Sequence, residues 1–318
     1  MFIILAAISP IFIMIGVGAV AVHLGILPRS SMRSLGTFVV HFALPCLLFR
    51  SLSHQSIGQA FNVGYLAAYA SGSLFAFFTG VVLAKYWHKR PNAIGAMVGV
   101  GMSLSNSAFI GYPLMLQFLG AKAVGPLVMC MIVENIVMLP LGFALAELES
   151  GHQLSLFQVI VQTVRRLSRN PLLIAILLGI IASVLHLALP APIAKVIDML
   201  AGASAPVALF VIGGTLVGIR LHGMATDILQ IGVGKLLLHP LAIFVMFLIL
   251  PPVPRQLVFA GILVASTPML SIYPILSQKY NYEDTASAAL VLVTAASFVT
   301  ITCIVWTLVR FLPMMFPS

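Results

Sequence analysis

Two short polar stretches lie inside long apolar runs of this 318-residue chain. The first, at residues 105–116, reads S-N-S-A-F-I-G-Y-P-L-M-L, and the second, at residues 266–276, reads S-T-P-M-L-S-I-Y-P-I-L. Both contain a Tyr-Pro pair, and proline removes a backbone donor and clashes with the preceding helical turn. We therefore predict that each stretch breaks a helix, just before Pro113 and just before Pro274.

Such breaks can bind an anion through neutral groups. A helix that restarts at about Leu114 or Ile275 presents unpaired N–H groups and roughly half a positive charge, which suits a carboxylate. Nearby hydroxyl and amide groups can bind a ligand without burying a net charge. The alternative is that the prolines only kink their helices and the hydroxyls satisfy freed carbonyls. The predicted substrate-binding residues are Ser105, Asn106, Ser107, Tyr112, Pro113, Thr267, Pro268, Ser271, Tyr273 and Pro274.

Charged residues inside apolar spans are the second candidate for chemistry. Glu134 lies in the middle of one span, where a carboxylate must be protonated, paired or hydrated, and its neighbour Asn135 is a predicted hydrogen-bond partner. Lys235 lies inside another span, with His239 one turn further along. We predict that Glu134 and Lys235 attract the anion or carry a coupled proton. The alternatives are a structural pair, or a lysine that extends its ammonium to the membrane surface.

The composition defines the setting of these residues. The chain is 61% hydrophobic and 7% charged, whereas soluble domains carry about 25% charged residues, so we predict an all-α polytopic membrane protein in the lipid bilayer. The net charge of +9 is spread over connecting loops and forms no basic stripe, so no nucleic-acid partner is expected. No metal-binding spacing of the three cysteines, H-E-x-x-H or G-x-S-x-G motif is present, so we predict no metal, no cofactor and no enzyme.

Ten apolar spans of helix length can be drawn, at residues 2–22, 34–53, 62–84, 93–119, 122–146, 170–189, 193–219, 226–250, 255–278 and 283–310. The predicted organisation is a first five-helix repeat at 1–147, a cytoplasmic connecting loop at 148–169 and a second repeat at 170–318. Lysine and arginine number ten in the odd loops and five in the even loops and at the ends, which predicts cytoplasmic odd loops and both termini outside. The odd loops hold Arg29, Arg33, Lys85, Lys89, Arg90, Arg165, Arg166, Arg169, Arg220 and Lys279.

An internal repeat relates the two halves. A shift of 161 residues places four prolines of the first half on prolines of the second, namely Pro10 on Pro171, Pro45 on Pro206, Pro91 on Pro252 and Pro113 on Pro274. Five helices per half invert the second half, so the broken fourth and ninth helices run in opposite directions and can cross near the midplane. Paired broken helices of this kind indicate the substrate site of a secondary transporter.

The chain resembles a bacterial member of the auxin efflux carrier family, related to plant PIN-type carriers and to the group that includes bile-acid/sodium symporters. The resemblance covers the whole chain and depends on the ten spans, the inversion, and Asn106 followed by Gly111 and Pro113. Thr267 departs from the pattern, because it stands where a second Asn would be equivalent. The resemblance implies a transport domain of crossed helices (spans 3–5 and 8–10) beside a scaffold (spans 1, 2, 6 and 7). It also implies small organic anions as substrates, including malate or malonate.

The function predicted from the sequence is alternating-access transport of a mono- or dicarboxylate across the bacterial inner membrane. Neither break contains Asp or Glu, which favours proton coupling or uniport. A sodium-coupled symporter of the same fold is the alternative, and homodimer formation is left open. A channel is disfavoured because no acidic ring or filter signature is present.

Overall fold

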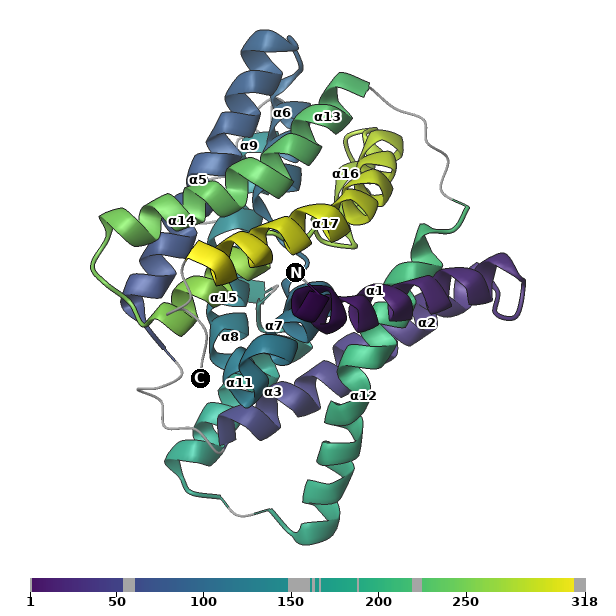
Figure 1. Cartoon of the computed structure of the whole chain (residues 1–318), viewed down its shortest axis with the longest axis vertical. Helices are drawn as coiled ribbons and strands as arrows, with labels where there is room; N and C mark the ends of the chain where they lie inside the picture. The colour runs from purple at the N-terminus through teal and green to yellow at the C-terminus, as the bar shows by residue number, and fades with distance from the viewer. Residues whose placement is uncertain are drawn as a thin grey trace.

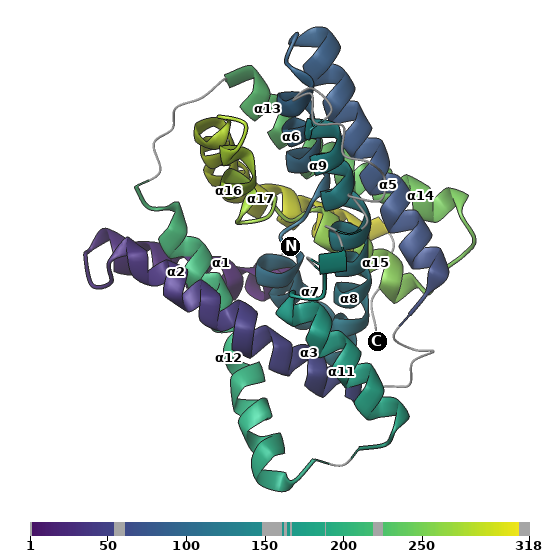
Figure 2. The ribbon, with the colours of Figure 1, turned by 180° about the vertical axis from the view of Figure 1, so that it is seen from behind.

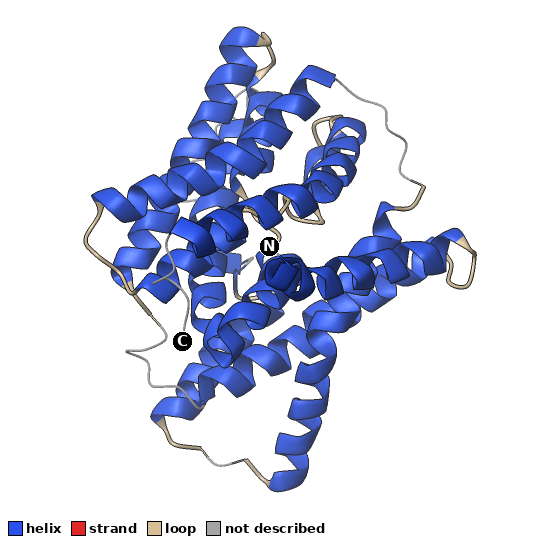
Figure 3. Ribbon diagram, in the orientation of Figure 1, coloured by secondary structure: helices blue, strands red, loops and turns tan. Residues whose placement is uncertain are grey.

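The computed structural model describes residues 2–53, 61–147, 161, 164–165, 167–187, 189–218 and 225–311. Within these ranges the regular structure is helical and contains no strand (Figure 3). Most of the predicted connecting loop at 148–169, and the loop residues Arg166 and Arg220, lie outside the described residues. The two halves of the sequence can therefore be compared helix by helix, but the segment that joins them cannot.

Six helical runs among the described residues are long and apolar enough to cross a membrane, at Arg29–Ser53, Val63–Trp87, Asn92–Glu147, Ala191–Leu216, Ala225–Ile249 and Glu283–Arg310. Three shorter apolar helices are Ile8–His23, Pro171–Val184 and Arg255–Ala265. All of these runs overlap the ranges drawn from the sequence. Their length and composition are those of a multi-pass membrane protein.

One bundle of helices is formed by α1 (Phe2–His23), α2 (Arg29–Phe38), α3 (Leu44–Ser53), α11 (Pro171–Val184) and α12 (Ala191–Leu216). It occupies the lower and right part of Figure 1, where α1 packs along α12, and α3 packs against α11 and α12. Glycines allow the close crossing of α1 and α12. A Cβ at Gly18 would lie 2.0 Å from the carbonyl oxygen of Phe210, and one at Gly213 would lie 1.7 Å from that of Ile15. Small residues at such crossings let apolar helices approach closely.

A second bundle contains the polar stretches. Its helices are α5 (Val63–Val82), α6 (Asn92–Ser103), α7 (Tyr112–Leu119), α8 (Val124–Ile132), α9 (Leu139–Glu147), α13 (Ala225–Val233), α14 (His239–Ile249), α15 (Arg255–Ala265), α16 (Tyr273–Gln278) and α17 (Glu283–Phe311). Here α5 packs against both α6 and α14, and α16 packs against α17 (Figure 2). The bundles meet where α1 contacts α7 and where α12 contacts residues 107–111.

Among the described residues, five π-helical segments interrupt the α-helices, at Val39–Ala43, Leu83–Trp87, Ser107–Gly111, Val133–Met138 and Gly234–Leu238. Four of them end two residues before a proline, namely Pro45, Pro113, Pro140 and Pro240. Because proline cannot donate to the preceding turn and clashes with it, a widened turn accommodates the ring while the helix continues. Three of the segments hold the polar residues singled out above: Ser107, Glu134 and Lys235.

Both predicted breaks occur, but the first lies earlier than expected. Helix α6 ends at Ser103 and the chain becomes helical again at Ser107, with Asn106 as the cap. The α-helix itself, α7, begins at Tyr112, close to the predicted restart at about Leu114, but the π-helical segment Ser107–Gly111 precedes it and was not predicted. In the second half, α15 ends at Ala265 and α16 begins at Tyr273, close to the predicted restart at about Ile275.

Candidate functional site

The two helix breaks touch each other through Asn106. Its backbone N–H donates to the carbonyl oxygen of Pro268 at 2.8 Å, and its side-chain Nδ2 donates to Ser271 Oγ at 2.7 Å. Its Oδ1 accepts from the backbone N–H of Phe109 at 3.3 Å and so caps the restarted helix. Asn106 thus joins segments that are about 160 residues apart in the chain.

Glu134 binds the start of the same restarted helix. Its Oε2 accepts from Ser107 Oγ at 2.5 Å, and its Oε1 accepts from the backbone N–H of Ser105 at 3.2 Å and from the Tyr69 hydroxyl at 3.3 Å. The residue is only 2% exposed. Because a helix N-terminus carries a partial positive charge, this is a favourable place for a carboxylate.

Lys235 lies at a helix C-terminus, whereas Glu134 lies at a helix N-terminus. Its Nζ donates to the carbonyl oxygen of Ala265, the last residue of α15, at 2.8 Å. It also donates to Ser105 Oγ at 2.8 Å and contacts His239 Nδ1 at 2.8 Å. Lys235 is 0% exposed, so the alternative in which it reaches the membrane surface is wrong. A cation here complements the partial negative charge of a helix C-terminus.

Two residues of α5 complete the cluster. The Tyr69 hydroxyl lies 3.3 Å from Ser105 Oγ as well as from Glu134, and Ser73 Oγ lies 3.0 Å from His239 Nε2. An ammonium can only donate, so His239 accepts at Nδ1 and donates from Nε2 to Ser73. Neither Tyr69 nor Ser73 is among the residues predicted from the sequence. The sequence marks these two residues only weakly, as two polar groups one helical turn apart in an apolar span.

Ser105 separates the buried anion from the buried cation. Its hydroxyl accepts from Lys235, and its backbone N–H donates to Glu134. In the described part of the chain no direct ion pair joins Glu134 and Lys235. Ser105 therefore bridges Glu134 and Lys235, the first through its backbone N–H and the second through its hydroxyl.

Several predicted residues lie apart from this cluster. Asn135 donates to the carbonyl oxygen of Met131 in its own helix at 2.9 Å, so its predicted bond to Glu134 is wrong. Consecutive residues of a helix do not face one another. Thr267 Oγ1 caps its own helix by donating to Val264 at 2.7 Å, and the Tyr273 hydroxyl donates to Met97 at 3.0 Å.

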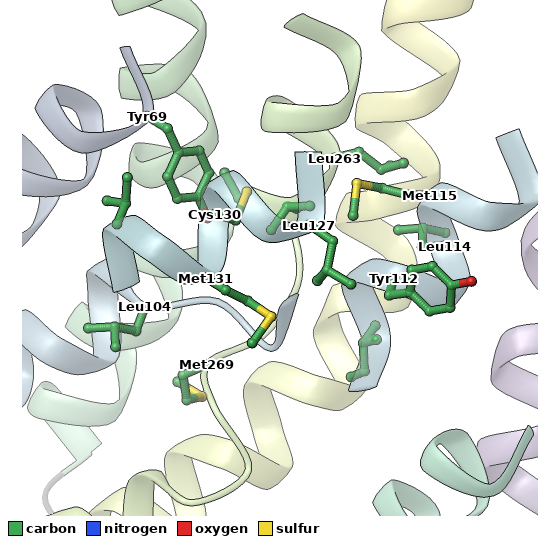
Figure 4. Close-up of a cluster of buried hydrophobic side chains, with 14 of the residues drawn as sticks. Tyr69, Leu104, Tyr112, Leu114, Met115, Leu127, Cys130, Met131, Leu263 and Met269 are labelled. Carbon is green, nitrogen blue, oxygen red and sulfur yellow. The ribbon is translucent and has the colours of Figure 1, made fainter. Parts of the chain in front are cut away.

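The remaining predicted residues are aromatic or prolines. Tyr112 lies in α7 with its hydroxyl directed away from the other labelled side chains of Figure 4. Pro113 is buried in the same helix, and Pro274 is in the first turn of α16. Only Pro268 takes part in the contacts, through its carbonyl oxygen. The residues brought together are thus Ser105, Asn106, Ser107, Pro268, Ser271, Glu134 and Lys235.

Apolar side chains surround the polar groups. Figure 4 shows Leu104, Met131 and Met269 beside the non-helical segments, and all are buried. Such surroundings exclude water and strengthen electrostatic interactions. No group of three or more His, Cys, Asp or Glu that can hold a metal ion occurs among the described residues.

A second buried acid, Asp227 at the start of α13, has a different environment. Its Oδ1 accepts from both Nε and Nη2 of Arg90 at 3.2 Å, and its Oδ2 accepts from the Tyr282 hydroxyl at 3.0 Å. Burial, together with Tyr273 and Asp227, raises the pKa of Tyr282 well above its usual range, so this hydroxyl stays protonated and donates. The ion pair ties the start of α13 to the segment before α6, and the Tyr282 hydrogen bond ties it to the residue before α17.

Comparison with known proteins agrees with a membrane carrier. The sequence model of a family described as "Membrane transport protein" matches residues 3–307. A protein of Rhizobium meliloti (strain 1021) named "Putative malonate transporter" is 26% identical over 294 residues, which cover 92% of this chain and 92% of that protein.

Proposed function

We propose that this chain, which belongs to the auxin efflux carrier family of membrane transport proteins, moves a small organic anion across the plasma membrane by alternating access. The observation that carries the proposal is the contact between the two helix breaks at Asn106. Helix breaks at membrane depth are tolerated where they are buried in protein or line a cavity, and paired breaks are typical of substrate sites. The name of the relative supports a malonate-like dicarboxylate over an auxin-like monocarboxylate.

The proposed architecture is ten membrane helices in two inverted repeats, 1–147 and 170–318, joined by 148–169. The shift of 161 residues supports it, because four pairs of helix starts in the two halves then agree to within two residues. The pairs of starts are Arg29 with Ala191, Val63 with Ala225, Asn92 with Arg255, and Tyr112 with Tyr273. The proposed orientation predicts that a cysteine at Lys89 reacts only from the cytoplasm and one at Lys122 only from outside. Swapped accessibility would contradict both the orientation and the inverted repeat.

Alternating access is proposed to occur as an elevator movement of the second bundle against the first. The division of the helices into two bundles supports this, since the crossing breaks belong to the second bundle and lie next to α12 of the first. The bundle with α1, α2, α3, α11 and α12 would then be the scaffold. A bound carboxylate would travel with Asn106 and Ser271.

Proton coupling is proposed to use Glu134. With Glu134 ionised, its charge is balanced by Lys235 across Ser105. A proton on Glu134 would leave Lys235 uncompensated in a buried setting, which favours entry of an anion. The sodium-coupled alternative is less well supported, because Lys235 already places a cation against Ala265 and Ser105.

The test is uptake by purified protein in liposomes, with labelled malonate, malate and indole-3-acetate under imposed proton or sodium gradients. We expect malonate uptake that follows the proton gradient and does not require sodium. Asn106→Ala is the site variant, and Asn135→Ala, whose side chain bonds only within its own helix, is the matched control. Uptake of the neutral malonamide, but of none of the acids, would overturn the proposed function.

A further inference from the structure

We infer that the end of α5 binds an anionic phospholipid, at a surface site formed by residues 82–89. The apolar run Val63–Trp87 ends here, at the top of the view in Figure 1, where a membrane-spanning helix passes into the layer of lipid head groups. Tyr86 and Trp87 are 74% and 78% exposed at this end. Both side chain types are enriched at membrane–water interfaces, because each has an apolar ring and a polar group that donates a hydrogen bond.

The shape of this helix end suits the hydrocarbon part of a lipid. A surface hollow of about 420 Å³ is lined by Val82, Leu83, Tyr86 and Trp87. Residues Leu83–Trp87 are π-helical, and this segment, unlike the other four, does not end two residues before a proline. No proline therefore explains the widened turn, and π-helical turns are frequent at functional sites. An apolar hollow between aromatic rings accommodates an acyl chain, so the ligand is a lipid and not free phosphate.

Two lysines give the site its selectivity for negative charge. Lys85 and Lys89 are exposed, and Lys85 Nζ lies 5.9 Å from the centre of the Tyr86 ring. Neither lysine belongs to an ion pair of the described residues, whereas Arg90 beside them is bound to Asp227. Uncompensated lysines at the membrane surface attract anionic lipids. The site therefore distinguishes an anionic head group such as phosphatidylglycerol from the neutral phosphatidylcholine.

The corresponding helix end of the second half has none of these groups. With the shift of 161 residues the charged and aromatic positions fall on apolar ones at the end of α14: Lys85 on Met246, Trp87 on Leu248 and Lys89 on Leu250. Selectivity for anionic lipid is thus a property of the α5 end and not of helix ends in general. The proposed orientation would place the site in the cytoplasmic leaflet, but the site itself does not depend on orientation or substrate.

Trp87 can report on the lipid beside it. The chain has two tryptophans, so Trp306→Phe leaves Trp87 as the only one. This variant is reconstituted in phosphatidylcholine vesicles with brominated phosphatidylglycerol or brominated phosphatidylcholine, whose acyl chains quench tryptophan fluorescence on contact. We expect brominated phosphatidylglycerol to reach half-maximal quenching at a mole fraction lower by about fivefold or more, given two lysines near the head group. Equal quenching by the two lipids, in protein that is folded by gel filtration, would overturn the inference.

Lysine variants in the same background identify the cause of the preference. Lys85→Gln with Lys89→Gln should abolish it, whereas Lys85→Arg with Lys89→Arg should keep it. Lys195→Gln, at an exposed lysine of α12 in the first bundle, is the matched control and should also keep it. A preference that persists in the double Gln variant would overturn the inference, because these lysines would then not select the lipid. So would a preference lost in sodium phosphate but kept in sodium chloride of equal ionic strength, because the site would then bind free phosphate.

Discussion

The two helix breaks occupy equivalent places in the proposed repeat but differ in what their side chains contact. In the first break, Ser105 accepts a hydrogen bond from Lys235 and Ser107 donates one to Glu134. Asn106 donates to Ser271 of the second break. In the second break, the equivalent of Ser105 is Ser266, which donates to Ile262 in its own helix at 2.7 Å, and the equivalent of Asn106, Thr267, likewise caps its own helix. The second break contributes mainly backbone carbonyls, from Ala265 and Pro268.

This difference shows that helix ends agree more closely than side-chain chemistry between the two halves of the proposed repeat. With the shift of 161 residues the ends of α6 and α15 agree to within one residue, but side-chain contacts between segments are concentrated in the first break. The position equivalent to Glu134 is Ala295, so the second half has no internal carboxylate at this place. Substitutions 161 residues apart should therefore have unequal effects, and such pairs serve as matched controls.

The largest expected effect is at Glu134, the acid bound to the first break. Glu134→Gln should abolish proton-driven accumulation of substrate in liposomes but spare counterflow, because exchange needs no net proton movement. The measurement is both assays on the same vesicles, with folding checked by gel filtration. Retained proton-driven accumulation in Glu134→Gln would show that another group carries the proton.

The next contrast compares Asn106 with Thr267. Asn106→Ala should weaken carboxylate binding by about 1–3 kcal/mol, because it leaves buried partners unmatched. That corresponds to a dissociation constant about 5 to 150 times higher. Thr267→Ala should leave the affinity unchanged, since its hydroxyl serves only Val264. Equal losses in both variants, measured by calorimetry, would mean that the two breaks bind substrate symmetrically.

Much of this arrangement was predictable from the sequence. The helix ranges and the existence of both breaks follow from apolar length and proline. Asn106, Glu134 and Lys235 could be singled out in the same way, and the structure places them at the breaks, while their roles stay predictions. The position of the first break could not be predicted, because a π-helical turn can accommodate a proline without breaking the helix next to it. Hydropathy does not detect such a turn. The recurrence of prolines two residues beyond such turns gives a usable signal for these segments.

The partners of the buried charges were harder to predict. Tyr69 and Ser73 reach the cluster from α5, and this depends on how α5 packs against α14. Asn135 was assigned to Glu134 because it is adjacent in sequence, but adjacent helical residues point in different directions. Packing between distant helices decides these contacts, and a single sequence does not contain it.

The two Tyr-Pro pairs give a smaller contrast. Pro113→Ala should let residues 107–111 close into a regular α-helix, which would turn Ser107 away from Glu134 and slow transport about tenfold. Pro274→Ala should have little effect, because Pro274 lies in the first turn of α16, where its missing N–H has no partner in the helix. Initial uptake rates of both variants, normalised to folded protein, test this. A larger loss at Pro274 would reverse the comparison.

The smallest contrast compares the effects on stability of Ser105→Ala and Ser266→Ala, which should differ in sign. Ser105→Ala removes the hydroxyl that accepts from Lys235 and lies next to Tyr69, so the protein should lose about 1–3 kcal/mol of stability. Ser266→Ala removes a hydroxyl that bonds back to the preceding turn, an interaction that slightly destabilises helices, so stability should stay the same or rise. Melting temperatures of both variants in the same detergent, with Asn135→Ala as control, measure the difference. If Ser266→Ala has a lower melting temperature than Ser105→Ala, the Ser266 hydroxyl contributes more to stability than its bond to Ile262 explains. The conclusion that side-chain contacts are concentrated in the first break would then be wrong.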